Sequence, residues 1–261
     1  MISPDATRGL ALSSLLLVSA GAFPARAGID ANVADSAVRT AAAGSESPDA
    51  GGGGPAVQLD ATDAYRLALV RMKSHLSVAR ALLQMRSPGA GYYMQEPLQE
   101  VFRDTEAELE RRSAPFTADF LQQLEAASAG DPVAALATIE SAVVAIDGSF
   151  AQTGAMDAKS VLAVSEALLR EAVARYADAV TDNEVIDLEK YQSGRGFVTE
   201  AEALVRYAGA LKERPGHEEL VNAVTLIRQA WPGVIPPPIV FDPASVAGRL
   251  DEAVAAMDKL R

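Results

Sequence analysis

The sequence predicts an all-α protein, an up-and-down helical bundle of about eight helices. Apolar residues recur at alternating steps of three and four along most of the chain after residue 59. Asp and Pro residues that favour helix starts precede most of these stripes. No stretch alternates with period two for long enough to form a sheet. The core must be built mainly from Leu, Val, Ile and Ala, because the chain has only one Trp, six Tyr and seven Phe.

The first four expected helices lie between residues 59 and 153, and each begins at a residue that suits a helix N-terminus. Asp and Thr accept hydrogen bonds from free backbone N–H groups, and Pro fits the first turn because it has no N–H to satisfy. The expected starts are Asp60 or Thr62, Pro97, Pro115 and Asp131. The apolar stripe of the first helix consists of Tyr65, Leu69, Met72, Leu76, Ala79 and Leu83.

The next four expected helices follow the turn at Gly154, with starts at Asp157, Asp187, Pro215 and Asp242. The longest regular stripe belongs to the first of them: Val161, Val164, Leu168, Val173, Tyr176 and Val180. Gly194 and Gly196 lie inside the second, where glycine weakens a helix, so we expect a kink or a split there. Residues 231–241 are expected to form a proline-stiffened loop.

Residues 59–261 are therefore expected to form the helical domain, with candidate halves 59–153 and 154–261. Two related four-helix bundles and a single domain of eight helices both fit this pattern.

The N-terminal residues 1–27 have the features of a secretory signal peptide. Arg8 supplies a positive charge, residues 10–22 are apolar, and Ala25-Arg26-Ala27 matches a signal-peptidase site. The apolar run of about 13 residues is shorter than the roughly 20 that a permanent span needs, so a cleaved signal is favoured over a retained anchor or a buried helix. Residues 28–58 show no apolar period and are expected to be a disordered tether. We expect a periplasmic or secreted protein with no stable membrane span after signal cleavage.

The formal charge of −12 makes the chain acidic, and signal cleavage would make it about −13. This charge argues against binding to nucleic acid or anionic lipid. The chain has no cysteine, which excludes disulfides, thiol chemistry and thiolate metal ligands.

The motifs that mark common enzymes are missing. The sequence contains no His-Glu-x-x-His, no Gly-x-Ser-x-Gly and no glycine-rich phosphate loop. No nucleophile, base and orienting group can be assembled, so we expect no enzymatic activity, and a metallopeptidase is the remaining enzymatic alternative.

Histidine and carboxylate residues are the candidates for metal binding. His75 lies beside the apolar stripe of the first helix, where a ligand or proton-transfer group in a bundle interior would lie. Glu96 and Glu100 belong to a row of acidic residues spaced four apart. If this row faces His75, His75 and Glu100 could share a divalent metal. A hydrogen-bonded interface histidine and a solvated acidic face are the alternatives.

The segment from Tyr176 to Val198, YADAVTDNEVIDLEKYQSGRGFV, resembles a segment of bacterial exported helical proteins. These include imelysin-like and iron-permease-associated extracytoplasmic domains. The resemblance implies that Glu189, Tyr191 and Arg195 occupy polar positions of that pattern. It also implies that His75 and Glu100 match its metal-handling positions.

The leading functional hypothesis is a non-enzymatic periplasmic binding or accessory module in metal-ion uptake or homeostasis. Iron and copper are the candidate ions, the only candidate cofactor is a divalent metal, and the candidate ligands are His75, Glu100 and Glu189. Glu96, Tyr191 and Arg195 are further candidate binding residues. The alternative is an envelope interaction or structural module without a metal site, whose loop at residues 231–241 engages a protein partner.

Overall fold

The computed structural model describes residues 57–261, except for the side chains of residues 96 and 97. All described residues belong to one compact unit, Asp49–Arg261. The predicted signal peptide (1–27) and nearly all of the predicted tether (28–58) lie outside the described residues, so both stay predictions.

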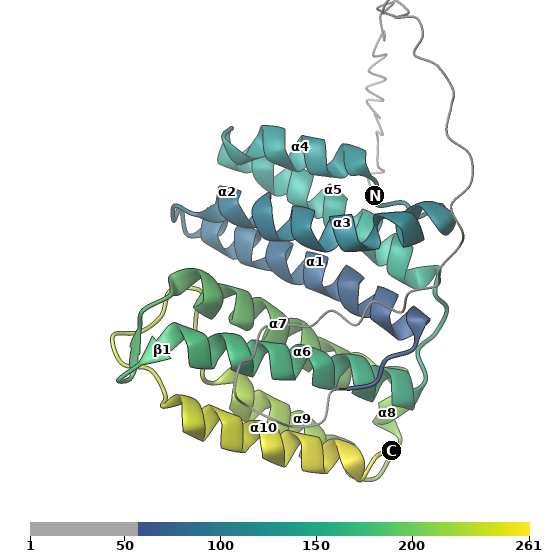
Figure 1. The fold of residues 1–261 in the computed structure, drawn as a ribbon, viewed down its shortest axis with the longest axis vertical. Coiled ribbons are helices and arrows are strands. Elements are labelled where there is room, and N and C mark those ends of the chain that lie inside the picture. Colours follow the sequence, from purple (N-terminus) through teal and green to yellow (C-terminus); the bar gives the residue numbers. More distant parts are fainter. Residues whose placement is uncertain (1–56) are drawn as a thin grey trace, which may run out of the picture. The chain divides into compact units, whose positions relative to one another are not determined.

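Most of the described chain is helical and its only strands are two residues each, which confirms the predicted all-α class. The helices before Gly154 are α1 (Ala61–Gln84), α2 (Ala90–Tyr93), α3 (Glu96–Arg111), α4 (Ala118–Ser128) and α5 (Pro132–Ala151). Those after it are α6 (Ala158–Ala179), α7 (Leu188–Tyr207), α8 (Gly209–Lys212), α9 (His217–Arg228) and α10 (Pro243–Asp258). The strands β1 (Val180–Thr181) and β2 (Glu184–Val185) lie between α6 and α7 (Figure 1). Helices α2 and α8, of four residues each, had not been expected as separate elements. Two expected starts are too early, since α4 begins at Ala118 rather than Pro115 and α9 at His217 rather than Pro215.

Aspartate caps explain why helix starts could be read from the sequence. The carboxylates of five aspartates accept hydrogen bonds from backbone N–H groups in the first turns of their helices: Asp60, Asp131, Asp157, Asp187 and Asp242. Each bond satisfies a donor that the helix itself leaves free. These contacts are local, so they depend little on the rest of the fold.

The buried apolar side chains form two clusters. One is built mainly from α1 to α5, and the other mainly from α6, α7, α9 and α10. Helix α1 contributes side chains to both clusters: Leu69 and Met72 belong to the first, and Leu67 and Val70 belong to the second. α1 accordingly packs against α3 and α5 on one side and against α6 and α7 on the other (Figure 1).

A short hairpin joins α6 to α7, although the sequence pattern predicted no sheet. Val180 pairs with Val185, and Thr181 with Glu184. The turn residues Asp182 and Asn183 have φ angles of 51° and 62°, the left-handed values that a tight two-residue hairpin requires and that Asp and Asn tolerate.

The expected split at Gly194 and Gly196 is wrong, since α7 is a single helix from Leu188 to Tyr207, and the expected kink stays a prediction. Both glycines allow close packing instead. A Cβ at Gly196 would lie 2.8 Å from the carbonyl oxygen of Ser74 in α1, and one at Gly194 would lie 3.1 Å from that of Ala172 in α6. α7 therefore approaches two neighbouring helix backbones at once.

Within residues 57–261, one helix, α5, is long and apolar enough to cross a membrane by length and composition. About a third of its apolar window is buried, and α5 packs against α1 and α4.

Candidate functional site

His75 is enclosed where α1, α2 and α7 meet. His75 is 2% exposed, and its ring stacks on that of Tyr93 with the ring centroids 6.4 Å apart. The ring of Phe197 meets it edge-on, with the centroids 5.4 Å apart. Its Nδ1 atom has no hydrogen-bond partner among the described residues. The structure thus places the predicted ligand in an aromatic environment between the two apolar clusters.

Burial is the main cause that lowers the pKa of His75 to about 3, and the positive charges of Arg175 and Arg71 act in the same direction. An imidazolium would lose its hydration there without gaining a nearby anion. His75 is therefore neutral at physiological pH, the form that can bind a metal or pack against aromatic rings.

The predicted carboxylate ligands lie elsewhere. Glu100 on α3 and Glu189 in the first turn of α7 are both exposed. The described part of the chain contains no group of three or more His, Asp or Glu residues that could hold a metal ion. The structure therefore does not bring His75, Glu100 and Glu189 together as one site. The side chain of Glu96 lies outside the described residues.

Tyr191 and Arg195, one turn apart on α7, do lie close enough to interact. Burial raises the pKa of Tyr191 to about 12, while the charges of Arg195 and Arg228 oppose this rise. Burial lowers the pKa of Arg195, and the like charge of Arg228 adds to the effect. The Tyr191 hydroxyl and the Arg195 Nε have no hydrogen-bond partner in the described chain. These groups can donate hydrogen bonds, but neither is a proton-transfer group near neutral pH.

The sequence did not indicate Arg228 as a member of this group. Arg228 lies in the last turn of α9, where the helix dipole by itself favours a basic residue. Its neighbours in the sequence therefore give no sign that it lies near Tyr191 and Arg195.

A second candidate site is the surface made by residues 182–188 and 235–241, here called the hairpin–loop face. The backbone N–H of Val240 donates to the carbonyl of Asn183 at 3.0 Å, which ties the loop to the hairpin. Trp231 and Val234 anchor the start of the loop in the interior. Ile186 is 68% exposed and Ile239 76% exposed. Three further large apolar residues are exposed on these two segments: Leu188, Ile235 and Phe241.

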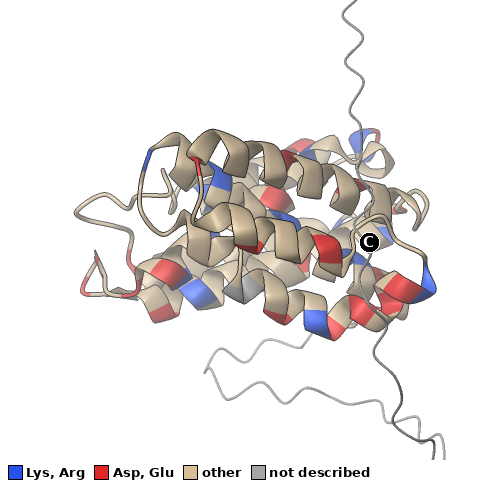
Figure 2. Cartoon of the chain, turned by 90° about the horizontal axis from the view of Figure 1, so that it is seen from above, with Lys and Arg blue, Asp and Glu red and all other residues tan. Residues whose placement is uncertain are grey.

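Acidic residues lie on and beside this apolar surface, while the guanidinium of Arg249 lies over the ring of Phe241. Asp182, Glu184 and Glu189 are exposed beside it, and acidic residues are visible at this end in Figure 2. Exposed apolar side chains with a polar rim are typical of interaction sites. The sequence indicates the loop as a candidate contact region, but no local feature of the sequence marks Ile186 or Leu188 as part of it.

The fold and these surfaces define an all-α helical bundle protein with a buried tyrosine beside a partly buried arginine, and with an exposed apolar face. Residues 151–260 match the family model of the iron permease-associated 4-helix bundle domain. This range covers α6 to α10 and confirms the resemblance to iron-permease-associated domains predicted from residues 176–198. No curated protein and no solved structure matches the chain.

Proposed function

We propose that this chain is a periplasmic, non-enzymatic accessory module of an iron-uptake system that docks on a partner protein. The match of residues 151–260 to an iron permease-associated domain carries this proposal. The export signal read from residues 1–27 supports the compartment.

The hairpin–loop face is the docking surface in this proposal. Ile186 and Ile239 are held outward by backbone structure, namely the hairpin and its hydrogen bond to the loop. Because the backbone already holds these side chains in place, binding a partner does not require the segment to become ordered first. Docking would remove their apolar surface from water, which is the main favourable contribution to most protein association.

Charge complementarity indicates what the partner presents. The exposed carboxylates of Asp182, Glu184 and Glu189 would repel an acidic surface and attract a basic one. We propose as occupant an extracytoplasmic segment of an iron permease with apolar residues flanked by Lys or Arg.

The double variant Ile186→Asp/Ile239→Asp tests this proposal. We expect it to fold normally, to lose binding to the purified permease, and to fail to restore iron uptake in a strain that lacks the chain. The matched control is Val144→Asp on α5, because Val144 is also 70% exposed but lies outside the face. Unchanged permease binding by the double variant would contradict the docking surface. Full iron uptake without the chain would contradict the accessory function.

Iron or copper binding by the chain itself stays a prediction. Calorimetry of the exported chain with Fe, Cu, Zn and Mn tests it, and no binding tighter than about millimolar would exclude metal carriage as its task.

A further inference from the structure

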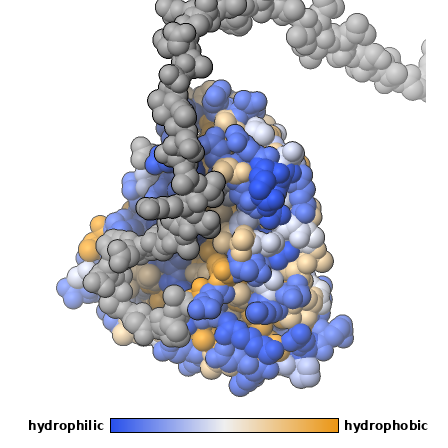
Figure 3. Space-filling model, turned by 45° about the vertical axis from the view of Figure 1, so that its right-hand side comes forward, coloured by the Kyte–Doolittle hydropathy of each residue, from blue (hydrophilic) through white to orange (hydrophobic). Residues whose placement is uncertain are grey.

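A cavity of about 520 Å³ lies at the end of α6 and α7 opposite the hairpin. Residues of α1, α5, α6, α7 and α8 and of the connection 154–156 line it. Its volume falls in the range of roughly 300–1,000 Å³ that is usual for small-molecule sites. The lining is mostly apolar and includes Phe150, Met156, Val161, Ala203, Leu204 and Tyr207. With this end turned forward, Figure 3 shows hydrophobic areas within a mainly hydrophilic face.

Glu200 places a carboxylate in this apolar lining. No hydrogen bond or ion pair joins it to another residue of the described chain. Burial raises the pKa of Glu200, and Asp147 acts in the same direction, while Lys73 and Arg80 oppose the rise. A half-buried carboxylate without a donor is unfavourable, and a ligand that donates hydrogen bonds would relieve this cost.

The other charged group of the lining is already paired. The Nζ atom of Lys73 lies 2.8 Å from a carboxylate oxygen of Asp147, which neutralises it. Arg80 is exposed to solvent and does not line the cavity. Glu200 therefore leaves the cavity with one uncompensated negative charge.

We propose that this cavity binds a small organic cation, an ammonium group carried on an apolar body, with Glu200 accepting hydrogen bonds from the ammonium. The apolar body would lie against Phe150, Met156 and Leu204. Tyr207 lines the cavity yet is 71% exposed, so its ring is accessible to a bound cation. This site is separate from the hairpin–loop face and does not depend on the proposed docking function.

The test compares two probes of matched shape on the full chain, 4-phenylbutylamine and 4-phenylbutanol, by NMR titration. We expect the amine to bind with a Kd in the millimolar range or lower, which is within the affinity that a ligand of its size can reach. Its affinity should be at least about tenfold higher than that of the alcohol. Lowering the pH should weaken amine binding by protonating Glu200, and the loss should begin at a higher pH than for an ordinary glutamate, because burial raises the pKa of Glu200. Alcohol binding should not change. Equal affinity of the two probes, or no amine binding at all, would overturn the proposal.

Glu200→Gln should reduce amine affinity about tenfold or more and leave alcohol affinity unchanged. The matched control is Glu140→Gln, an exposed position on α5 outside the cavity, which should have no effect on either probe. Ala203→Phe should abolish binding of both probes by filling the space. Unchanged amine affinity in Glu200→Gln would contradict the site. The comparison of the two probes on the natural chain remains decisive even if a variant does not fold.

Discussion

The hydroxyl of Tyr93 lies 3.0 Å from Oε1 of Gln192 and 3.0 Å from the carbonyl oxygen of Glu189. It thereby connects α2 to α7. Nε2 of Gln192 in turn donates to the carbonyl of Val234 at 3.0 Å. One chain of hydrogen bonds therefore joins α2, the first turns of α7 and the proline loop.

Tyr93→Phe should lower the free energy of unfolding by about 1–2 kcal/mol, because Oε1 of Gln192 is left buried without its donor. Urea unfolding measures the change. Tyr207→Phe is the control, since the exposed Tyr207 should change stability by less than about 0.5 kcal/mol. Equal effects of the two variants would show that the buried connection contributes nothing.

His75 should make the protein sensitive to acid. Its folded pKa of about 3 lies below the ordinary value of 6.5, so the unfolded chain takes up the proton first as the pH falls. Stability is present above the unfolded pKa and is lost as the pH falls toward the folded pKa. The loss attributable to His75 between pH 7 and pH 5 should be about 2 kcal/mol.

His75→Leu should remove this part of the acid sensitivity. The stability difference between the two proteins, measured by urea unfolding at several pH values, should shift in favour of the variant as the pH falls. Parallel pH profiles would mean that His75 titrates normally in the folded protein.

Two glycine-to-alanine replacements should change the free energy of unfolding in opposite directions. Gly196→Ala places a Cβ 2.8 Å from a backbone oxygen of α1, which cannot move aside easily, so we expect a loss of about 1–3 kcal/mol. Gly248→Ala in α10 meets nothing within 4 Å and should stabilise the helix by about 0.5–1 kcal/mol. Thermal unfolding of both variants checks the prediction, and a neutral Gly196→Ala would mean that α1 and α7 can separate at little cost.

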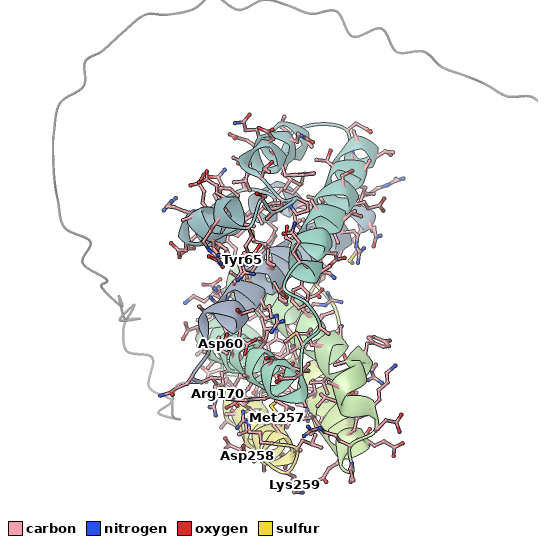
Figure 4. The ribbon with its side chains drawn as sticks, turned by 90° about the vertical axis from the view of Figure 1, so that its right-hand side faces the viewer. Asp60, Tyr65, Arg170, Met257, Asp258 and Lys259 are labelled. Carbon is pink, nitrogen blue, oxygen red and sulfur yellow. The ribbon has the colours of Figure 1, made fainter. Side chains whose placement is uncertain are left out.

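Glu166 should contribute more than a surface carboxylate. Its side chain is 5% exposed and pairs with both Arg170 and Arg261. In the view of Figure 4, Arg170 of α6 lies next to Met257 and Asp258 at the C-terminal end of α10. Glu166→Gln leaves both guanidinium groups without this anion, so we expect a loss of about 1–3 kcal/mol.

The comparison for Glu166 is Glu219→Gln, which breaks the pair with Lys259. That carboxylate is 57% exposed, and solvent screening should keep the change within about 0.5 kcal/mol. Similar losses in the two variants would contradict a special contribution from the buried carboxylate.

The helix starts could be predicted because they depend on contacts within a few residues. Asp157 accepts from the N–H of Ser160, and Asp187 accepts from that of Lys190, whatever lies elsewhere in the chain. The same local reasoning wrongly predicted a split at Gly194 and Gly196. These glycines instead allow neighbouring helices to approach closely, which is not a local feature of the sequence. The candidate metal ligands show the same limit: a spacing of four residues places carboxylates on one helix face, but it does not determine which helix that face meets.

The sequence by itself determined the all-α class, the aspartate-capped helix starts and the resemblance to iron-permease-associated domains, since periodicity and capping are local. Only the tertiary structure decided that α1 serves two cores and that His75 is enclosed away from Glu100 and Glu189. It also decided that residues 182–188 and 235–241 form one surface and that Glu200 lines a cavity. Each of these depends on contacts between residues far apart in the chain, and these are set by the packing of whole helices rather than by local sequence.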